Sequence, residues 1–177
     1  MRRLLLLAVA LMAVATACGG NTETPEALAF IDPFPPPSGE VVLTITGAAQ
    51  PNVGSEVQID IASIEALGLE TVTVADPFSS SDLVFSGVSI EKVLAAAGIS
   101  GDSPLTWTAL DDYEVSYSGD EARANGGFLA TRVDDQTIGI AEGGPVRIVF
   151  TEASDGDALL ANDSNQWIWS LDNITVE

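Results

Sequence analysis

The feature that most constrains the fold is a series of short apolar segments, separated by turn residues every 8–12 residues through most of the chain. Many of them alternate apolar and polar residues, the pattern of a strand with one buried face. The segments expected to form strands are 41–46, 56–61, 71–75, 82–86, 105–110, 113–118, 127–133, 146–150, 166–170 and 173–177. The pattern predicts an α+β domain that is mainly β.

Two short helices are expected among these strands. One is the ASIEAL segment at 62–67. In the other, apolar residues recur at helical spacing from Ile90 to Ala97. Ser89 is placed to cap the start of this second helix, and Gly98 is placed to end it.

The N-terminus has the parts of an export signal. MRR is followed by the apolar run Leu4–Ala17, whose 14 residues are too few to span a bilayer. The stretch ATAC at 15–18 resembles the lipobox of bacterial lipoproteins, in which the cysteine is acylated and becomes the first mature residue. We therefore expect an extracytoplasmic protein that is lipid-anchored to the bacterial cell membrane through Cys18. The alternative is an ordinary secretory signal with a cysteine nearby.

A tether is expected to follow Cys18. Residues 19–39 contain Gly-Gly and five prolines, three of them consecutive, which favours an extended spacer. Phe30, Ile31 and Phe34 are expected to be loosely placed linker residues rather than docked on the domain. The expected organisation is a signal peptide at 1–17, a lipidated cysteine and tether at 18–39, and one domain at 40–177.

Charge and missing residue types exclude several functions. The chain has 26 acidic and 6 basic residues, and removal of Arg2 and Arg3 with the signal would change the formal charge from −20 to −22. Binding to nucleic acid is therefore disfavoured. The absence of histidine excludes Ser-His and Cys-His nucleophile pairs and imidazole metal sites. If Cys18, the only cysteine, is acylated, thiolate metal sites are excluded too.

Four motifs occur in a characteristic order. They are FSGVSIEKVLAAAGI at 85–99, ALDDYEVSY at 109–117, GFLATRVDDQTIGIAEGGPVRIVF at 127–150 and QWIWSLDNITV at 166–176. In this order the chain resembles the oxidoreductase molybdopterin-binding domain of the sulfite oxidase type, over about 41–177. The resemblance implies a mixed, mainly β fold with a pterin cofactor held in a cleft at one face.

The resemblance also implies a position for a molybdenum-binding cysteine, and this chain has no cysteine there. Family enzymes hold molybdenum through a cysteine thiolate and the dithiolene of the pterin, and that cysteine corresponds to a position near Ala75. The neighbouring Asp76 offers a carboxylate, a poor replacement for thiolate at such a metal. Glu142 and Gln166 stand where relatives often carry histidine and a basic residue.

The candidate cofactor pocket, vestigial or not, consists of Ala75, Asp76, Tyr113, Arg132 and Arg147. We expect Ala75, Asp76 and the strands of Tyr113 and Arg147 to meet at one cleft. Asp76 should be exposed, or bonded to backbone N–H groups, or near Arg132 or Arg147. The alternative for the two arginines is an exposed strand position paired with one of the many acids.

Other candidate site residues have simpler interpretations. Core packing is favoured over a ligand cleft for the aromatic residues Trp107, Tyr113, Tyr117, Trp167 and Trp169. A turn is favoured over a paired-carboxylate acid/base site for Asp111 and Asp112. A solvated acidic loop is favoured over a calcium site for Asp155, Asp157, Asp163 and Asn165.

Three functions remain open from the sequence. The first is a non-catalytic, lipid-anchored binding or accessory protein with no cofactor, which would contact a small-molecule ligand or a redox partner protein. The second is an active molybdopterin-dependent oxidoreductase with an oxygen ligand near Asp76. The third is a structural cell-surface module.

Overall fold

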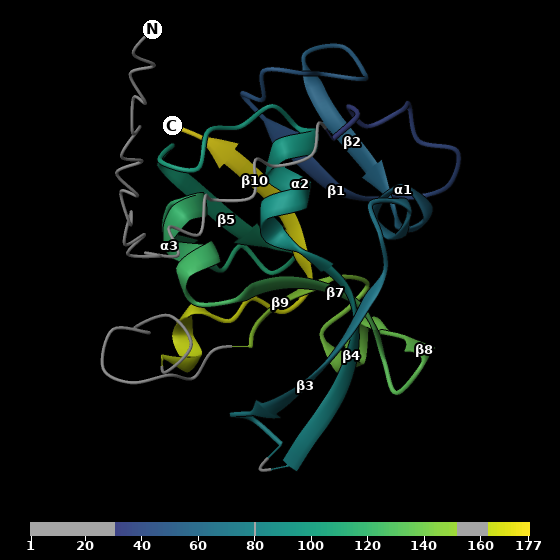
Figure 1. Ribbon diagram of the computed structural model, residues 1–177, viewed down its shortest axis with the longest axis vertical. Helices are drawn as coiled ribbons and strands as arrows, with labels where there is room; N and C mark the ends of the chain where they lie inside the picture. The colour runs from purple at the N-terminus through teal and green to yellow at the C-terminus, as the bar shows by residue number, and fades with distance from the viewer. Residues whose placement is uncertain (1–30, 80, 152–162) are drawn as a thin grey trace, which may run out of the picture.

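The protein is known from a computed structural model, which describes residues 31–79, 81–151 and 163–177. These residues form two β-sheets with short helices against them, as Figure 1 shows. The predicted α+β, mainly β class is confirmed. The signal peptide and Cys18 lie outside the described residues.

The first sheet has five strands, in which β1 and β10 are parallel and the other neighbours antiparallel. Its strand order is β2 (Glu56–Asp60), β1 (Val41–Thr46), β10 (Leu171–Val176), β5 (Leu105–Ala109) and β6 (Glu114–Ser116).

The second sheet is antiparallel throughout, and its strand β7 pairs with three others. The order is β3 (Glu70–Asp76), β4 (Ser81–Ser89), β7 (Gly127–Val133) and β8 (Gln136–Thr137), with β9 (Arg147–Phe150) also paired to β7. Leu43 and Ile59 of the first sheet and Phe85 and Leu129 of the second belong to one buried apolar cluster. The two sheets therefore share one hydrophobic core.

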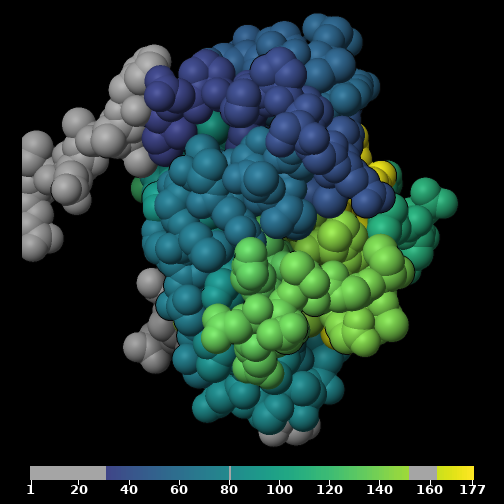
Figure 2. Space-filling model, turned by 90° about the vertical axis from the view of Figure 1, so that its right-hand side faces the viewer, coloured from purple at the N-terminus to yellow at the C-terminus, as the bar shows by residue number. Residues whose placement is uncertain are grey.

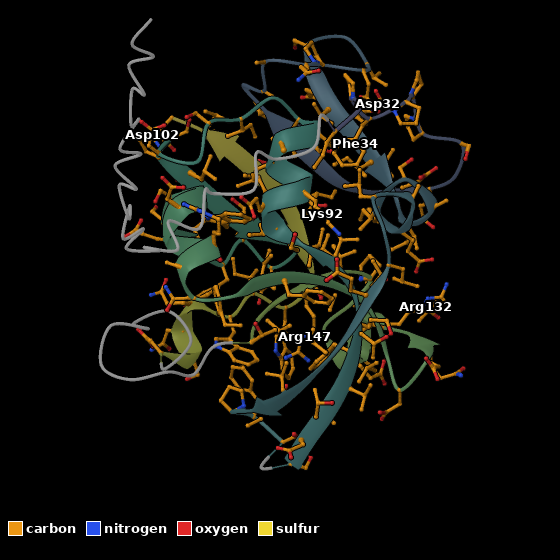
Figure 3. The ribbon with its side chains drawn as sticks, in the orientation of Figure 1. Asp32, Phe34, Lys92, Asp102, Arg132 and Arg147 are labelled. Atoms are coloured by element: carbon orange, nitrogen blue, oxygen red, sulfur yellow. The ribbon has the colours of Figure 1, made fainter. Side chains whose placement is uncertain are left out.

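The segment before β1 lies on the domain instead of hanging free. Phe34 is only 4% exposed, and Ile31 packs against the same core. The expectation of loosely placed linker residues is therefore wrong for Phe34 and Ile31, while Phe30 lies outside the described residues. In Figure 2 the purple residues that begin the described chain lie against the blue residues of β2 and α1 (Ile61–Ala66), and Figure 3 places Phe34 there.

Asp60 fixes this segment to the domain. Its Oδ2 accepts hydrogen bonds from the backbone N–H groups of Ser38 and Gly39, each at 2.7 Å. Its Oδ1 accepts the N–H of Ser63 at 2.8 Å and so caps α1. One carboxylate thus stabilises a helix start and holds the chain that precedes β1.

Helix α2 (Ile90–Ala96) ends as its sequence predicts. Gly98 adopts φ +72°, and the N–H groups of Gly98 and Ile99 donate to the carbonyls of Ala95 and Leu94. This is the Schellman arrangement that glycine favours after a helix. At the other end Ser89 occupies the N-cap position, but its side chain makes no capping hydrogen bond.

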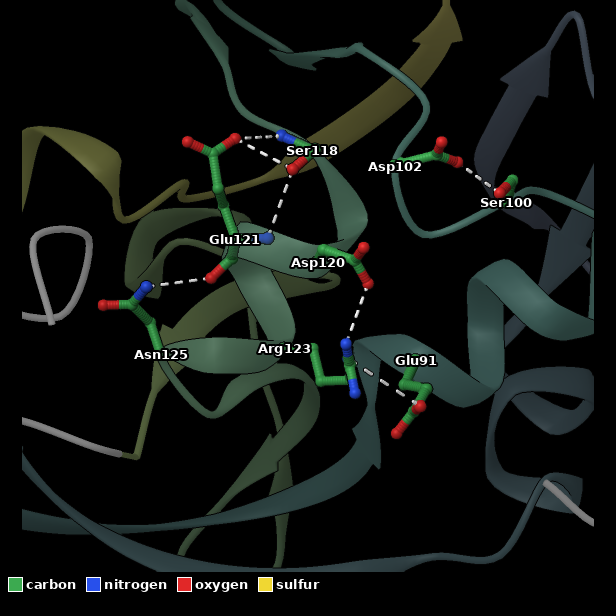
Figure 4. A network of polar contacts seen from close by, with 8 residues as sticks. All are labelled: Glu91, Ser100, Asp102, Ser118, Asp120, Glu121, Arg123 and Asn125. Carbon is green, nitrogen blue, oxygen red and sulfur yellow. Dashed lines mark hydrogen bonds and ion pairs between the residues drawn. The ribbon is translucent and has the colours of Figure 1, made fainter. Parts of the chain in front are cut away.

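Helix α3 (Gly119–Ala124) was not predicted from the sequence. Ser118 Oγ accepts the N–H of Glu121, and the Glu121 carboxylate accepts the N–H of Ser118, which forms a reciprocal capping box (Figure 4). The spacing Ser-x-x-Glu was the available signal. The expected strand at 113–118 accordingly shortens to β6, because Ser118 begins the helix.

The described residues also form two short 3₁₀ turns, η1 (Ile140–Glu142) and η2 (Ser164–Gln166). In the part of the chain that the structure describes, no helix is long and apolar enough to cross a bilayer.

The expected strand at 166–170 is wrong. The segment starts inside η2 and then follows β9 irregularly, with Ile168 accepting a hydrogen bond from Ile148 N–H at 2.8 Å. Ser170 adopts φ +50°, which interrupts an extended conformation. Trp169 is 40% exposed, while Trp167 is 5% exposed.

The β3–β4 hairpin extends away from the body of the molecule at the lower end of Figure 1. Strand β4 pairs with β7 and has a register shift at Ser86–Gly87, and a Cβ on Gly87 would lie 2.1 Å from the carbonyl oxygen of Leu129. Only glycine allows this close approach. The tip of the hairpin carries Asp76 and Phe78, two residues of the candidate site.

Candidate functional site

A buried ion pair lies at the end of the β3–β4 hairpin. Asp76 is the last residue of β3 and Arg147 the first of β9, and the two are each 4% exposed. Nη2 of Arg147 donates to Oδ2 of Asp76 at 3.0 Å. Oδ1 of Asp76 accepts the N–H groups of Phe78 and Ser79 at 2.8 and 2.9 Å. Both carboxylate oxygens are therefore engaged within the chain.

Aromatic rings enclose the guanidinium of Arg147. Its Cζ lies 5.1 Å from the ring centre of Phe85 and 4.9 Å from that of Trp169, distances typical of cation–π contacts. Burial lowers the pKa of Arg147, and the charge of Asp76 opposes that shift. Nε of Arg147 is buried without a hydrogen-bond partner among the described residues. The guanidinium is held by one carboxylate and two rings.

An open cavity of about 300 Å³ lies beside this pair. We call it the aromatic cavity, because four rings line it together with polar side chains. Its lining includes Phe78, Asp111, Tyr113, Asn165, Trp167 and Trp169. Phe78, Tyr113 and Trp169 are 49%, 43% and 40% exposed, so much of their ring surface faces solvent. Large aromatic side chains exposed together commonly mark a binding surface.

Separate parts of the chain hold these rings in place. Phe78 packs edge-on against Trp169 with ring centres 5.1 Å apart, and against Trp167 at 6.4 Å. The hydroxyl of Tyr113 donates to the carbonyl oxygen of Asn165 at 2.7 Å. A Cβ on Gly143, whose φ is +83°, would lie 2.8 Å from the ring of Trp169. The absence of a side chain at Gly143 leaves the space that Trp169 occupies.

Phe78 and Trp169 contact the ion pair and also line the aromatic cavity. The N–H of Phe78 binds Asp76, while its ring lines the cavity. The ring of Trp169 contacts Arg147 and also lines the cavity. A change in the ion pair is therefore expected to move the walls of the cavity.

The structure brings together three of the five candidate residues. Asp76 and Arg147 form the pair, and Tyr113 lines the cavity beside it. Of the alternatives expected for Asp76, the structure shows a neighbouring cation and hydrogen bonds from backbone N–H groups, and not exposure. Ala75 is exposed on the face of β3 opposite to Asp76.

Arg132 lies at a different place on the second sheet. Its Nε and Nη2 donate to the two carboxylate oxygens of Glu65 in α1, at 2.8 and 2.9 Å. Figure 3 shows Arg132 and Arg147 well separated. Arg132 thus follows the alternative interpretation, a partly exposed strand residue paired with an acid, whereas Arg147 is buried.

Core packing holds for some of the aromatic residues and not for others. Trp107 and Tyr117 stack in the core with ring centres 4.9 Å apart, and Trp107 Nε1 donates to the carbonyl of Tyr117 at 3.0 Å. Burial raises the pKa of the Tyr117 hydroxyl. Tyr113 and Trp169, in contrast, are partly exposed, so the core interpretation is wrong for them.

Sequence reasoning missed Phe78. Its signal was an aromatic residue directly after Pro77, in the turn between the strands expected at 71–75 and 82–86, where an apolar ring has no core to enter. Asp111 and Asp112 form the expected turn, with φ +64° at Asp112, and Asp111 also lines the cavity.

The acidic residues near 160 are only partly described. Asp163 accepts the backbone and side-chain N–H groups of Asn165, which lowers the pKa of Asp163, while Asp155 and Asp157 lie outside the described residues. Glu142 is exposed in η1, and Gln166 is half-buried. Within residues 31–79, 81–151 and 163–177, no three acidic, cysteine or histidine side chains are grouped to hold a metal ion.

Comparison with known proteins gives a family and a fold. Residues 42–166 match the family model of the oxidoreductase molybdopterin binding domain. The structure is similar to that of the sulfane dehydrogenase SoxCD from Paracoccus pantotrophus, with a TM-score of 0.55 and 15% sequence identity. The similarity covers 76% of this chain and only 37% of the SoxCD chain. No curated protein sequence matches this chain.

Proposed function

Since the chain belongs to the oxidoreductase molybdopterin-binding domain family, we propose that it is a non-catalytic member of it, a lipid-anchored extracytoplasmic protein that binds a small molecule. The aromatic cavity would be the binding site. The proposal rests on a cavity with an exposed aromatic lining, next to an arginine and an aspartate that form an ion pair with each other.

The ion pair of Asp76 and Arg147 is the observation that carries the non-catalytic assignment. A molybdopterin carries an anionic phosphate, which proteins bind with free arginine, lysine or backbone N–H groups. Arg147, the cation beside the cavity, is buried and paired with Asp76. An entering phosphate would have to separate this pair and leave the Asp76 carboxylate buried without its partner, which is strongly unfavourable.

The residues near the inferred ligand position also do not fit a thiolate-held molybdenum centre. Ala75 has only a methyl group, and that group is exposed on the opposite face of β3. Asp76 accepts three hydrogen bonds within the chain, so a metal would have to displace them. The described residues contain neither cysteine nor histidine.

Metal analysis tests the non-catalytic assignment. The full chain would be purified from a host that makes the molybdenum cofactor, and molybdenum would be measured by mass spectrometry against protein concentration. We expect no more molybdenum than in a control protein that does not bind the cofactor and is purified from the same host. Stoichiometric molybdenum that is lost in Asp76→Asn would establish the competing function, an oxidoreductase with an oxygen ligand.

Lipid attachment at Cys18 is tested separately by metabolic labelling. Cells grown with an alkyne fatty acid should yield labelled protein, because acylation at a lipobox cysteine attaches fatty chains to it. Cys18→Ser should abolish the label and release the protein from the membrane fraction. Equal labelling of the two proteins would contradict the anchor.

A further inference from the structure

We propose that the aromatic cavity binds a small organic cation of the quaternary or alkyl-ammonium class. This inference rests on the proposed function and names its ligand. The rings of Phe78, Tyr113, Trp167 and Trp169 and the carboxylate of Asp111 form the recognition surface.

The aromatic lining is suited to a cation. The faces of tryptophan, tyrosine and phenylalanine rings attract a cation through their quadrupoles, and several rings around one ammonium group reinforce that attraction. Trp169 already binds the guanidinium of Arg147 in this way at 4.9 Å. The same kind of contact is available to a ligand on the rings that remain partly exposed, Phe78, Tyr113 and Trp169.

The charges around the cavity disfavour an anion. Every lysine and arginine in the described part of the chain is in an ion pair with a carboxylate: Lys92 with Glu70, Arg123 with Asp120, Arg132 with Glu65 and Arg147 with Asp76. An anionic ligand would therefore find no uncompensated cation there. Asp111 lines the cavity, is exposed and lies in a chain of formal charge −20. A cation is attracted both by the carboxylate of Asp111 and by the net negative charge of the chain.

The size of the cavity limits the ligand. A volume of about 300 Å³ is at the lower end of small-molecule sites. It accommodates a trimethylammonium group with a short tail. Choline and its neutral isostere 3,3-dimethylbutan-1-ol are therefore suitable probes, because they differ in charge and hardly in shape.

Titration with these two probes tests the proposal. The full chain, purified in detergent, would be titrated with choline chloride and with 3,3-dimethylbutan-1-ol at low ionic strength, while tryptophan fluorescence is recorded. Saturable binding of choline, about tenfold tighter than that of the alcohol, is expected from the cation–π contribution. Equal affinity for the two probes, or a preference for the alcohol, would overturn the proposal.

Two neighbouring carboxylates give a matched pair of variants. Asp111→Asn should weaken choline binding several-fold and leave the alcohol unaffected, since Asp111 lines the cavity. Asp112→Asn removes the same charge from the next residue, which does not line it, and should leave choline binding unchanged; asparagine tolerates the φ of +64° there. Equal effects of both variants would show a general charge effect and contradict the site.

The result is independent of the molybdenum measurement. A protein that lacks molybdenum and also fails to bind choline would retain the proposed non-catalytic role but not the ligand class. A protein that contains molybdenum and binds choline would overturn the non-catalytic role but not the cation site.

Discussion

Arg147 and Asp76 form a buried ion pair although 71 residues separate them in the sequence. The pair joins the end of β3 to the start of β9, two strands that share no ladder hydrogen bonds. It therefore fixes the tip of the β3–β4 hairpin, and with it the ring of Phe78, to the body of the domain. Stability and the shape of the aromatic cavity thus depend on the same contact.

Arg147→Met should destabilise the protein strongly. It leaves the Asp76 carboxylate buried with only its two backbone partners, and breaking a buried pair in this way costs about 3–5 kcal/mol. Urea unfolding followed by fluorescence would measure the loss. Arg132→Met is the matched control, because its partly exposed pair with Glu65 should contribute about 1 kcal/mol or less.

The double variant Asp76→Asn with Arg147→Met should be less destabilised than the sum of the two single variants. Asparagine removes the buried charge that methionine leaves unpaired, so the two losses are coupled. A double-mutant cycle on the free energies of unfolding measures this coupling. Strict additivity would mean that the pair contributes nothing beyond its separate residues.

Asp60→Asn should lower stability more at neutral pH than in acid. The hydrogen bonds from Ser63, Gly39 and Ser38 hold the pKa of Asp60 far below its usual 3.8. The native state thus binds fewer protons than the unfolded state, and this stabilisation, present above pH 3.8, is lost as the pH falls further. At pH 7 the variant should lose about 1–3 kcal/mol in urea unfolding.

Repeating the urea unfolding of the wild type and Asp60→Asn at pH 3 distinguishes the stabilisation that depends on the Asp60 charge from that which depends on the shape of its side chain. The difference between the wild type and Asp60→Asn should shrink, while Asp82→Asn, at an exposed position, should show little change at either pH. A difference that stays constant from pH 7 to pH 3 would show that the depressed pKa is not what stabilises the cap.

Much of the fold could be predicted because its strands have local signals. Alternating apolar residues mark β1, and the glycine after α2 marks its end, since both patterns depend on neighbours in the sequence. The segment at 166–170 has the same apolar composition as a strand, but the positive φ of Ser170 interrupts it. That conformation depends on contacts with residues distant in the chain, such as the carbonyl of Gly143.

The candidate site could be predicted only in part. Arg147 and Asp76 were expected in one region from motif order, yet their direct contact joins two strands that are distant in sequence and do not pair with each other. A position near residue 75 was inferred by counting, and counting does not determine which face of a strand a side chain takes. Phe78 has no periodic neighbours, so only the folded hairpin shows that its ring meets Trp169.

Gly87→Ala should destabilise the protein by about 1–3 kcal/mol or more, because the new methyl group would overlap the carbonyl oxygen of Leu129. The overlap involves backbone, so β4 and β7 must separate to relieve it. The midpoint of thermal unfolding would report the loss. Gly39→Ala is a suitable control, since its Cβ would meet only ordinary contacts beginning at 3.4 Å.

Ala75→Cys should present an accessible thiol rather than a metal ligand in the cavity. Ala75 is exposed, whereas its neighbours Val74 and Asp76 are buried on the opposite face of β3. In a Cys18→Ser background, the Ala75→Cys thiol should react with a maleimide at the rate of an unstructured peptide. Val74→Cys, buried as a small apolar side chain, should react only through opening of the native structure. Protection of both thiols would place residue 75 on the inner face and would make a thiolate ligand at that position sterically feasible.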